Sequence, residues 1–343
     1  MTDWLPAAFN DGWAYRDRPA AAERSVACFY AATYPHSGLE VWWQRLAAGQ
    51  IWRNGQQLWG DGPLAAGDQL VWHRPPWQEA AVPVLPGPLF DDGDLVVFNK
   101  PSGLPVLPAG GFVRHTLLGQ LEAQVQAAAL DAALGLPRPV HRLGRFTSGL
   151  LVCARTRAAR ACLSAQLRES TAQASTNDPL PISGTHKLYR ALLAVPSGGS
   201  PLLRLKPGQS CTIDTPIARR PHNELGVIWC AAGADLPAQA GVPAPLPAFS
   251  RFTLMEARDA GWLFAVAIAT GRPHQIRIHA AAAGAPLQGD PLYGPGGQAR
   301  SGALPGDGGY QLHAHRVVLQ TTTGEQLAFE APVPQALQAQ GGG

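Results

Sequence analysis

The chain has 343 residues, of which 46% are hydrophobic, so it can form one large domain or two unequal ones with a substantial core. Its net charge of +3 and charged fraction of 15% exclude a polybasic tail as the feature that selects a partner. The five cysteines form no Cys-x-x-Cys pair, which argues against a disulfide framework or a zinc site. There is no apolar run of about 18 residues and no secretory leader, so we expect a cytoplasmic protein without a membrane span.

The first part of the chain predicts a small αβ unit. Residues 1–36 have weak periodicity and predict an irregular arm or short strand pieces. Ser37-Gly38-Leu39-Glu40 has the spacing of a helix capping box, and apolar residues at helical spacing continue to Gly49. Asn54-Gly55 between short strands is typical of a hairpin, because both residues tolerate positive φ. Another strand is expected over residues 69–74.

This order of helix, hairpin and strand resembles the alpha-L RNA-binding motif. The resemblance implies that Arg45 and Arg53 contact phosphates while tryptophans stack on bases. A small αβ cap with tryptophans in its core is the alternative. Five prolines between residues 75 and 88 indicate a semi-rigid linker. We therefore expect two domains, residues 1–85 and residues 86–343.

The second part begins with a short buried strand at residues 95–98, which leads into the turn Lys100-Pro101-Ser102-Gly103. Thr116 is a suitable N-cap for a helix that we expect to reach about Leu134. The polar loop His141-Arg142-Leu143-Gly144-Arg145 then precedes Thr147-Ser148-Gly149 and an apolar run. Polar groups at the mouth of a buried strand are typical of a site loop, although an ordinary turn has the same pattern.

Strand patterns dominate the rest of the chain. Lys187-Leu188-Tyr189 begins an apolar strand, after a segment, residues 170–186, that has loop composition. Residues 250–257 and 262–268 predict a hairpin. A last strand, residues 311–319, contains Leu-His-Ala.

One helix in this part carries polar residues of chemical interest. Residues 270–284, Thr-Gly-Arg-Pro-His-Gln-Ile-Arg-Ile-His-Ala-Ala-Ala-Ala-Gly, predict a helix that begins near the proline and ends at the glycine. His274 and Arg277 are three residues apart and share one face near the helix start. Gly-Asp-Pro-Leu-Tyr-Gly follows at residues 289–294.

These motifs, in this order, resemble those of the RluA-type pseudouridine synthases, over roughly residues 90–335. The resemblance implies an α+β fold with a mixed, largely antiparallel sheet and a central cleft. It also implies the isomerisation of uridine to pseudouridine in structured rRNA or tRNA. The reaction detaches uracil from ribose and rejoins it through carbon 5, so we expect no cofactor.

By position, the resemblance assigns three catalytic places, and one of them departs from the family pattern. Gly144 stands where the family has its catalytic aspartate. Tyr189 matches the tyrosine that stacks on the base, and Arg277 matches the arginine that pairs with the aspartate. The residues expected to bind RNA, besides Arg45 and Arg53, are Lys100, His141, Arg142, Arg145, Arg272 and His274.

The missing carboxylate leaves two hypotheses. In the first, the protein is an enzyme in which another acid serves, for which Asp290, Asp92 and Glu169 are the candidates. In the second, it is a catalytically silent RNA-binding homologue. In either case Arg277 lacks its family partner, which is costly for a semi-buried cation unless another acid or an RNA phosphate pairs with it.

Other chemistries fit the sequence less well. A Gly-x-x-x-x-Gly-Lys loop is absent, and Ser148 is not in a Gly-x-Ser-x-Gly elbow. Four histidines have no carboxylate at ligand spacing, so hydrogen-bonded structural roles are favoured and no metal is expected. These histidines are His274, His279, His313 and His315. We expect a monomer whose partner is RNA.

Overall fold

The computed structural model describes residues 3–127, 134–173, 187–222, 224–233, 243–268, 270–321 and 324–340, with side chains left out over 168–173. The chain forms two compact units. The larger unit contains Met1–Pro6, Ala81–Arg219 and Trp229–Gly343, and the smaller unit contains Ala7–Ala80 and Arg220–Ile228. This division differs from the expected single boundary at residue 85. Residues 1–6 belong to the larger unit, and residues 220–228 belong to the smaller unit.

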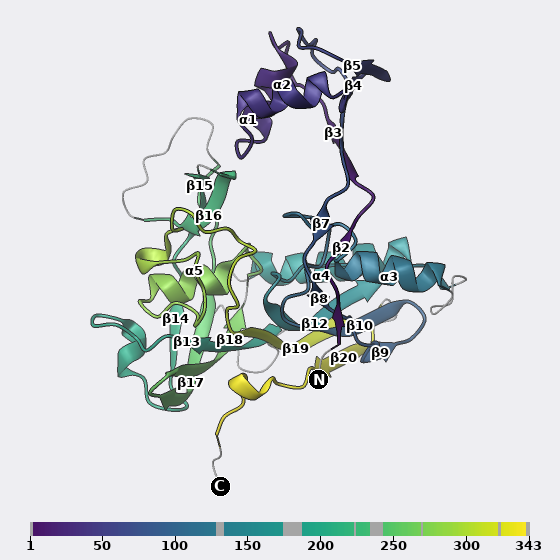
Figure 1. Cartoon of the computed structure of the whole chain (residues 1–343). Coiled ribbons are helices and arrows are strands. Elements are labelled where there is room, and N and C mark those ends of the chain that lie inside the picture. Colours follow the sequence, from purple (N-terminus) through teal and green to yellow (C-terminus); the bar gives the residue numbers. More distant parts are fainter. Residues whose placement is uncertain are drawn as a thin grey trace. The chain divides into compact units, whose positions relative to one another are not determined.

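A mixed sheet of ten strands is the framework of the larger unit (Figure 1). Its main path runs β14-β17-β18-β13-β19-β12-β10-β9, while β11 pairs with β12 and β20 pairs with β19. The pair β12–β19 is parallel and the other described pairs are antiparallel, which confirms the expected sheet type. The strands are β9 (Phe90–Asp91), β10 (Leu95–Lys100), β11 (Arg138–Pro139), β12 (Thr147–Ala154), β13 (Lys187–Leu193), β14 (Ser210–Ile213), β17 (Ser250–Arg258), β18 (Gly261–Ile268), β19 (Leu312–Gln320) and β20 (Gln326–Glu330).

The remaining elements of the larger unit are short, apart from three helices. They are α3 (Leu117–Gln126), α4 (Arg157–Gln173), α5 (Gln275–Ala282), the 3-10 turns η2 (Pro201–Arg204), η3 (Pro295–Gly297) and η4 (Gln335–Leu337), and the strands β1 (Trp4–Leu5) and β8 (Val82–Pro83). The strands β15 (Ile217–His222) and β16 (Gly226–Ala231) pair with each other, and each has residues in both units. Thr116 caps α3 as expected, because its side chain accepts from the Gly119 amide. Residues 128–133, over which the sequence predicts a continuation of α3, lie outside the described residues, as do residues 174–186 of the expected loop. None of the described helices is long and apolar enough to span a membrane.

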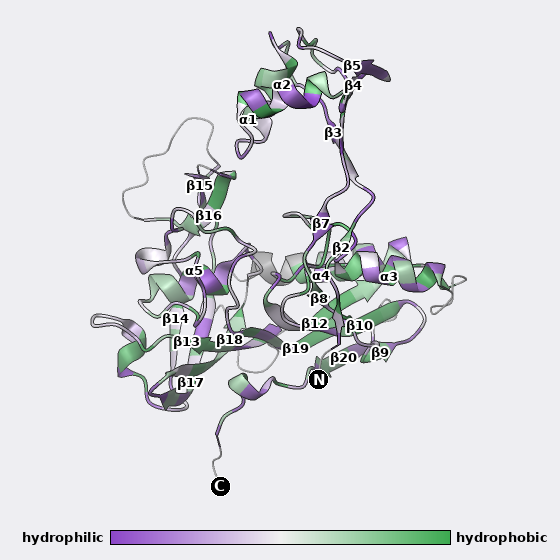
Figure 2. Cartoon of the chain, viewed as in Figure 1, coloured by the Kyte–Doolittle hydropathy of each residue, from purple (hydrophilic) through white to green (hydrophobic). Residues whose placement is uncertain are grey.

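Two helices cover opposite faces of β10 and β12, and the alternation of apolar side chains along the strands explains why. Successive side chains of a strand point to opposite faces. One set packs with α3: Val96, Phe98, Leu151 and Cys153 with Leu117 and Leu121. The other set packs with α4: Leu95, Val97, Leu150 and Val152 with Ala159, Leu163 and Leu167. Every residue of β12 is buried, and Figure 2 shows the hydrophobic colouring of these strands.

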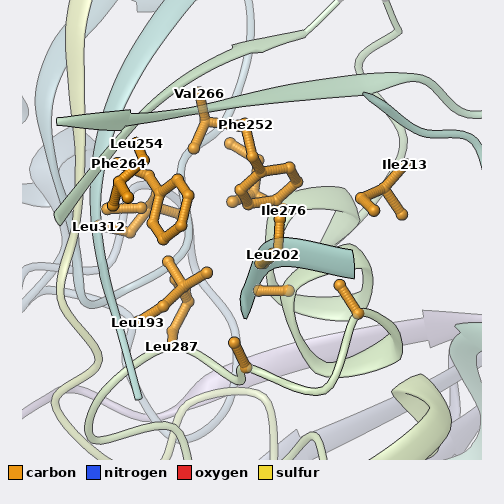
Figure 3. Packing of buried hydrophobic residues seen from close by; sticks show 14 of the residues in the cluster. Leu193, Leu202, Ile213, Phe252, Leu254, Phe264, Val266, Ile276, Leu287 and Leu312 are labelled. Carbon is orange, nitrogen blue, oxygen red and sulfur yellow. The ribbon is translucent and has the colours of Figure 1, made fainter. Parts of the chain in front are cut away.

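A separate core holds α5 against the other half of the sheet. Phe252 of β17 and Phe264 of β18 meet edge to face, with ring centroids 6.0 Å apart, and Ile276 of α5 packs in the same cluster (Figure 3). The strands β17 and β18 pair antiparallel up to Arg258 and Gly261, which confirms the expected hairpin. The strands β13 and β19 lie between the two halves of the sheet, so side chains from both halves can converge there.

The smaller unit packs two helices on a four-stranded sheet of order β3-β6-β4-β5. Tyr30, Trp42 and Trp72 are fully buried or nearly so and form its centre. Asn54 and Gly55 both have positive φ, which confirms the expected hairpin turn. Its elements are β2 (Ala8–Phe9), β3 (Trp13–Asp17), α1 (Val26–Thr33), α2 (Leu39–Ala47), β4 (Ile51–Arg53), β5 (Gln56–Leu58), β6 (Leu70–Arg74) and β7 (Gln78–Glu79).

The expected capping box at the start of α2 is wrong. Gly38 is the N-cap and makes no side-chain cap bond. Ser37, which the spacing assigned to that role, is buried and accepts a hydrogen bond from Arg45 instead. The helix still begins at Leu39 because its apolar face packs in the core, where Trp42 and Leu46 are buried.

Gly149 is the position where the parallel pair β12–β19 excludes a side chain. Its φ is +101°, and a Cβ there would lie 2.2 Å from the carbonyl oxygen of Ala314. We expect Gly149→Ala to lower the free energy of unfolding by about 3 kcal/mol or more, from conformational strain plus a clash with backbone. The measurement is chemical denaturation followed by circular dichroism.

Gly93→Ala is the matched control for this variant. Gly93 has a φ of +98°, but a Cβ at this position would have nothing within 4 Å, so only the conformational cost of about 1 kcal/mol remains. Equal losses in the two variants would show that close packing of β12 on β19 contributes nothing.

Candidate functional site

A cavity of about 170 Å³ lies at the centre of the large sheet, where its two halves meet. The 141–145 loop, the strands β12, β13 and β19, and the start of α5 form its walls. Its lining residues include the three positions that the sequence singled out, and they come from three separate parts of the chain. These are Gly144, Tyr189 and Arg277. The sequence-based expectation that these positions lie together therefore agrees with the geometry.

Each of the three positions is held by its own element. Gly144 precedes β12, and its carbonyl accepts from the Thr147 amide at 3.0 Å. Tyr189 lies on β13 and packs against the apolar clusters of both halves of the sheet. Burial raises the pKa of Tyr189 to about 12, so its hydroxyl is neutral at physiological pH. Arg277 is in the first turn of α5 and is 2% exposed.

The Arg277 guanidinium is paired, although Gly144 supplies no carboxylate. Its Nε and Nη2 donate to the two oxygens of Asp290 at 2.8 and 2.7 Å, a bidentate geometry that is strong and directional. Its Nη1 donates to the Pro305 carbonyl at 3.2 Å. Burial would lower the pKa of Arg277, but the hydrogen bonds and charge of Asp290 outweigh burial and raise it. Asp290 is thus the ion-pair partner of Arg277. Asp290 is not among the residues that line the cavity.

The space beside Gly144 is filled by Tyr310, which the sequence analysis did not identify. A Cβ built on Gly144 would lie 2.2 Å from the Tyr310 Oη. That hydroxyl is 3.3 Å from the Thr147 Oγ1, and the Tyr310 ring lies over Arg277 with the guanidinium carbon 4.2 Å from its centroid. Tyr310 follows a glycine-rich segment with no periodic pattern, so no sequence signal indicated this position.

Cationic side chains line the cavity, and among the residues that the structure describes none of those lining it is acidic. Arg142 is exposed there and Arg272 is half-buried, and Arg316 and Lys187 contribute from the strands. Burial lowers the pKa of Lys187 to about 8, which leaves it mostly charged at pH 7. The sequence analysis missed Lys187 as a site residue, although its spacing of two from Tyr189 on a strand places both side chains on one face.

The two histidines of the cavity are neutral and structural. Burial lowers the pKa of His141 to about 3, and its Nε2 accepts from the Val152 amide at 3.0 Å. Burial and the charge of Arg277 lower the pKa of His274 to about 3. His274 has a left-handed backbone as the N-cap of α5, and its Nδ1 lies 2.7 Å from the Tyr293 hydroxyl. Both histidines line the cavity without adding positive charge.

Two of the residues expected to contact RNA are occupied elsewhere. Lys100 is fully buried, and its Nζ donates to the carbonyls of Pro101, Leu104 and Arg145. Arg145 donates to the carbonyls of Gly103 and Gly306. Neither lines the cavity. Instead of contacting RNA, Lys100 ties the 101–104 turn to the 141–145 loop and so positions Gly144.

The two arginines of the smaller unit that were expected to contact RNA are also engaged within that unit. The Arg45 guanidinium lies between the rings of Trp42 and Trp72, with its carbon 4.2 Å from each centroid. Arg53 donates to the Pro63 carbonyl at 2.7 Å. Residues 7–80 contain six arginines, no lysine and seven acidic residues, so this unit carries no excess of positive charge for a phosphate backbone.

The other expected sites have simple structural explanations. The Asp92 carboxylate accepts from the amides of Asp94 and Leu95 in the turn before β10 and does not line the cavity. The side chain of Glu169 lies outside the described residues. Among the residues that the structure describes, no group of three or more His, Cys, Asp or Glu could hold a metal ion. His279, for example, is bonded to Ser250 and to the Thr215 carbonyl.

Comparisons with known proteins point to one family. The model of the family described as RNA pseudouridylate synthase matches residues 94–282. An uncharacterized RNA pseudouridine synthase of Synechocystis sp. is 38% identical over 313 residues, covering 90% of this chain and 94% of that protein. Ribosomal large subunit pseudouridine synthase D of Neisseria meningitidis serogroup A is 31% identical over 315 residues, covering 88% of this chain and 72% of that protein. The solved structure of human RNA Pseudouridylate Synthase Domain Containing 4 has a TM-score of 0.50 at 18% identity, over 73% of this chain and 90% of that chain, which supports the fold alone.

The Arg277–Asp290 pair allows a direct test of its contribution to stability. Asp290→Asn leaves a buried guanidinium without its counter-charge, so we expect the free energy of unfolding to fall by about 3–5 kcal/mol. Glu330→Gln is the matched control, because the Arg316–Glu330 pair is 3.3 Å long with side chains 42% and 62% exposed, and such pairs contribute about 1 kcal/mol or less. Chemical denaturation of both variants measures the difference; a loss as small as that of the control would contradict a structural role for Asp290.

The close approach of Gly144 to Tyr310 predicts coupled substitutions. Gly144→Ala places a methyl group against the Tyr310 hydroxyl, and we expect a loss of about 1–3 kcal/mol of stability from overpacking. In Gly144→Ala/Tyr310→Phe the nearest ring atom, Cζ, is 3.5 Å from the new methyl group, an ordinary contact, so the alanine should then cost little. A double-mutant cycle of unfolding free energies measures the coupling; additive losses would mean that the two positions do not touch.

Proposed function

Because the chain belongs to the RNA pseudouridylate synthase family, we propose that it isomerises uridine to pseudouridine in structured ribosomal or transfer RNA, and that the cavity beside Gly144 receives the target uridine. The observation that carries this assignment is the convergence of Gly144, Tyr189 and Arg277 on one cavity. A relative of this chain is named as acting on the ribosomal large subunit, which supports ribosomal RNA as the first substrate to test.

The chemistry of the cavity matches an extruded nucleotide. The target base must leave its stack before its glycosidic bond can be reached. The ring of Tyr189 offers a face on which a uracil can stack, and stacking of this kind stabilises by about 1–3 kcal/mol per base. Arg142 and Arg272 at the rim can contact the flanking phosphates. We therefore assign base stacking to Tyr189 and phosphate binding to the two rim arginines.

The smaller unit is proposed to assist RNA binding through aromatic rings more than through charge. Trp43 and Trp59 are 49% and 66% exposed, and exposed indoles can stack on unpaired bases. Arg45 stays within the tryptophan core and supports the fold of this unit.

We also propose that the protein acts as a cytoplasmic monomer. The five cysteines are free, as is usual in a reducing compartment.

A second function, RNA binding without isomerisation, is favoured by one specific observation. Among the described residues, those lining the cavity include no carboxylate, and both oxygens of Asp290 are bonded to Arg277. A protein of this kind would retain the cationic rim and Tyr189 but lack the group that begins cleavage of the glycosidic bond.

Tritium release from RNA labelled at carbon 5 of uridine separates the two functions, because only isomerisation removes that hydrogen. We expect release by the wild-type chain from a large-subunit rRNA transcript or from unmodified tRNA transcripts. Gly144→Asp is an unsuitable comparison by itself, because the new side chain meets the Tyr310 hydroxyl. Gly144→Asp/Tyr310→Phe is the better one: release by this variant alone would establish the silent RNA-binding function.

The assignment of Tyr189 is tested by RNA affinity. Tyr189→Ala removes the stacking surface and should weaken binding of the RNA substrate about 10-fold or more. Tyr189→Phe keeps the ring and is the matched control, with an expected dissociation constant within about threefold of the wild type. Filter binding at one fixed salt concentration measures both; equal affinities of the alanine and phenylalanine variants would contradict stacking.

A further inference from the structure

The structure points to Tyr310 as the group that replaces the family carboxylate: we propose that its hydroxyl oxygen attacks the ribose of the bound uridine and later accepts the proton from carbon 5. This proposal rests on the proposed function and adds the catalytic residue that the sequence does not supply. The first observation is that the Tyr310 hydroxyl lies where a side chain at position 144 would begin: a Cβ built on Gly144 would be 2.2 Å from the Tyr310 Oη. The hydroxyl thus occupies the volume next to the backbone from which a carboxylate would project.

The surroundings of Tyr310 hold its hydroxyl at the cavity. Its ring is 2% exposed and is fixed by an edge-to-face contact with Phe146, with centroids 6.0 Å apart. The Arg277 guanidinium lies over the face of the Tyr310 ring and also restricts the ring. Tyr310 itself lines the cavity together with Gly144 and Thr147. A rigidly held nucleophile of this kind loses little conformational freedom when the substrate binds.

The neighbouring polar groups suit a phenol that gains negative charge. Arg277 places a cation against the ring, where charge spread from the oxygen is stabilised. The Thr147 Oγ1, 3.3 Å from the Tyr310 Oη, can donate a hydrogen bond to the oxygen while its negative charge develops. Asp290 faces the edge of Arg277 that carries Nε and Nη2, so it fixes the arginine without entering the cavity.

The chemistry balances without any co-reactant, and tyrosine is among the side chains that form covalent intermediates. First, Oη forms a bond to carbon 1′ of the ribose as the bond from carbon 1′ to N1 breaks, and the phenolic proton goes to N1 of the departing uracil. The uracil then turns, and its carbon 5 attacks carbon 1′ while the bond to Oη breaks. The phenolate finally takes the proton from carbon 5, which restores the phenol and leaves pseudouridine.

Tyr310→Phe isolates the hydroxyl, because it keeps the ring, the Phe146 contact and the Arg277 contact. We expect kcat for tritium release from the labelled rRNA or tRNA transcripts to fall about 100-fold or more, with KM and RNA affinity within about threefold of wild type. Tyr15→Phe, which removes a tyrosine hydroxyl in the smaller unit, is the matched control and should leave both quantities unchanged. A purely structural role for the hydroxyl would alter stability or affinity without this selective loss of kcat.

The remaining variants separate this proposal from the proposed function. If Tyr310→Phe keeps more than about a third of the wild-type kcat, the role of Tyr310 is overturned while the isomerase function stands. If the wild type is inactive and Gly144→Asp/Tyr310→Phe is active, both are overturned and the protein is a silent homologue. If neither releases tritium from either RNA, both are again overturned. If kcat for tritium release falls in Tyr310→Phe and recovers in Gly144→Asp/Tyr310→Phe, the Tyr310 hydroxyl and a carboxylate at position 144 perform the same chemical role, which supports the proposal.

Discussion

The bidentate ion pair between Arg277 and Asp290 is the interaction on which the site depends. A buried guanidinium without a counter-charge would be expensive, and the polar loop before β12 supplies none because Gly144 has no side chain. Asp290 supplies the counter-charge: both of its oxygens accept hydrogen bonds from Arg277, and its side chain is fully buried. The arginine is therefore fixed and compensated before any RNA binds, and its face is left for the ring of Tyr310.

The same arrangement explains how the site keeps its shape with no side chain at position 144. The Tyr310 hydroxyl fills the space beside Gly144, so the loop neither collapses nor leaves a void. Lys100 holds this loop through the Arg145 carbonyl and also bonds the carbonyls of Pro101 and Leu104 in the preceding turn. The described lining of the cavity is cationic, because Arg142, Arg272 and Lys187 contribute to it and no described lining residue is a carboxylate. A polyanion is the partner that this balance favours.

The sequence predicted the elements that have strong local patterns, and the family resemblance predicted the fold class. The sequence predicted no helix over Val26–Thr33, where the structure has α1. Thr116 at the N-cap of α3, the Asn54-Gly55 turn and the β17–β18 hairpin each depend on a few neighbouring residues. The capping box at Ser37 was wrong because burial of that serine and its bond from Arg45 outweighed a favourable spacing. Lys100 and Arg145 were expected to contact RNA because they are cationic and lie in motifs, yet burial turned both into supports for backbone carbonyls.

By itself, the sequence determined the strands and helices that have strong local patterns, and its resemblance to the family predicted the mixed sheet and a glycine where the family has an aspartate. Only the tertiary structure decided what stands beside that glycine. Residues 144, 277, 290 and 310 lie in separate elements or loops, and no periodicity connects them. Their meeting depends on the register of β12, β13 and β19 and on the packing of α5, which are properties of the assembled core. For that reason the partner of Arg277 and the occupant of the carboxylate position could be read only from three-dimensional contacts.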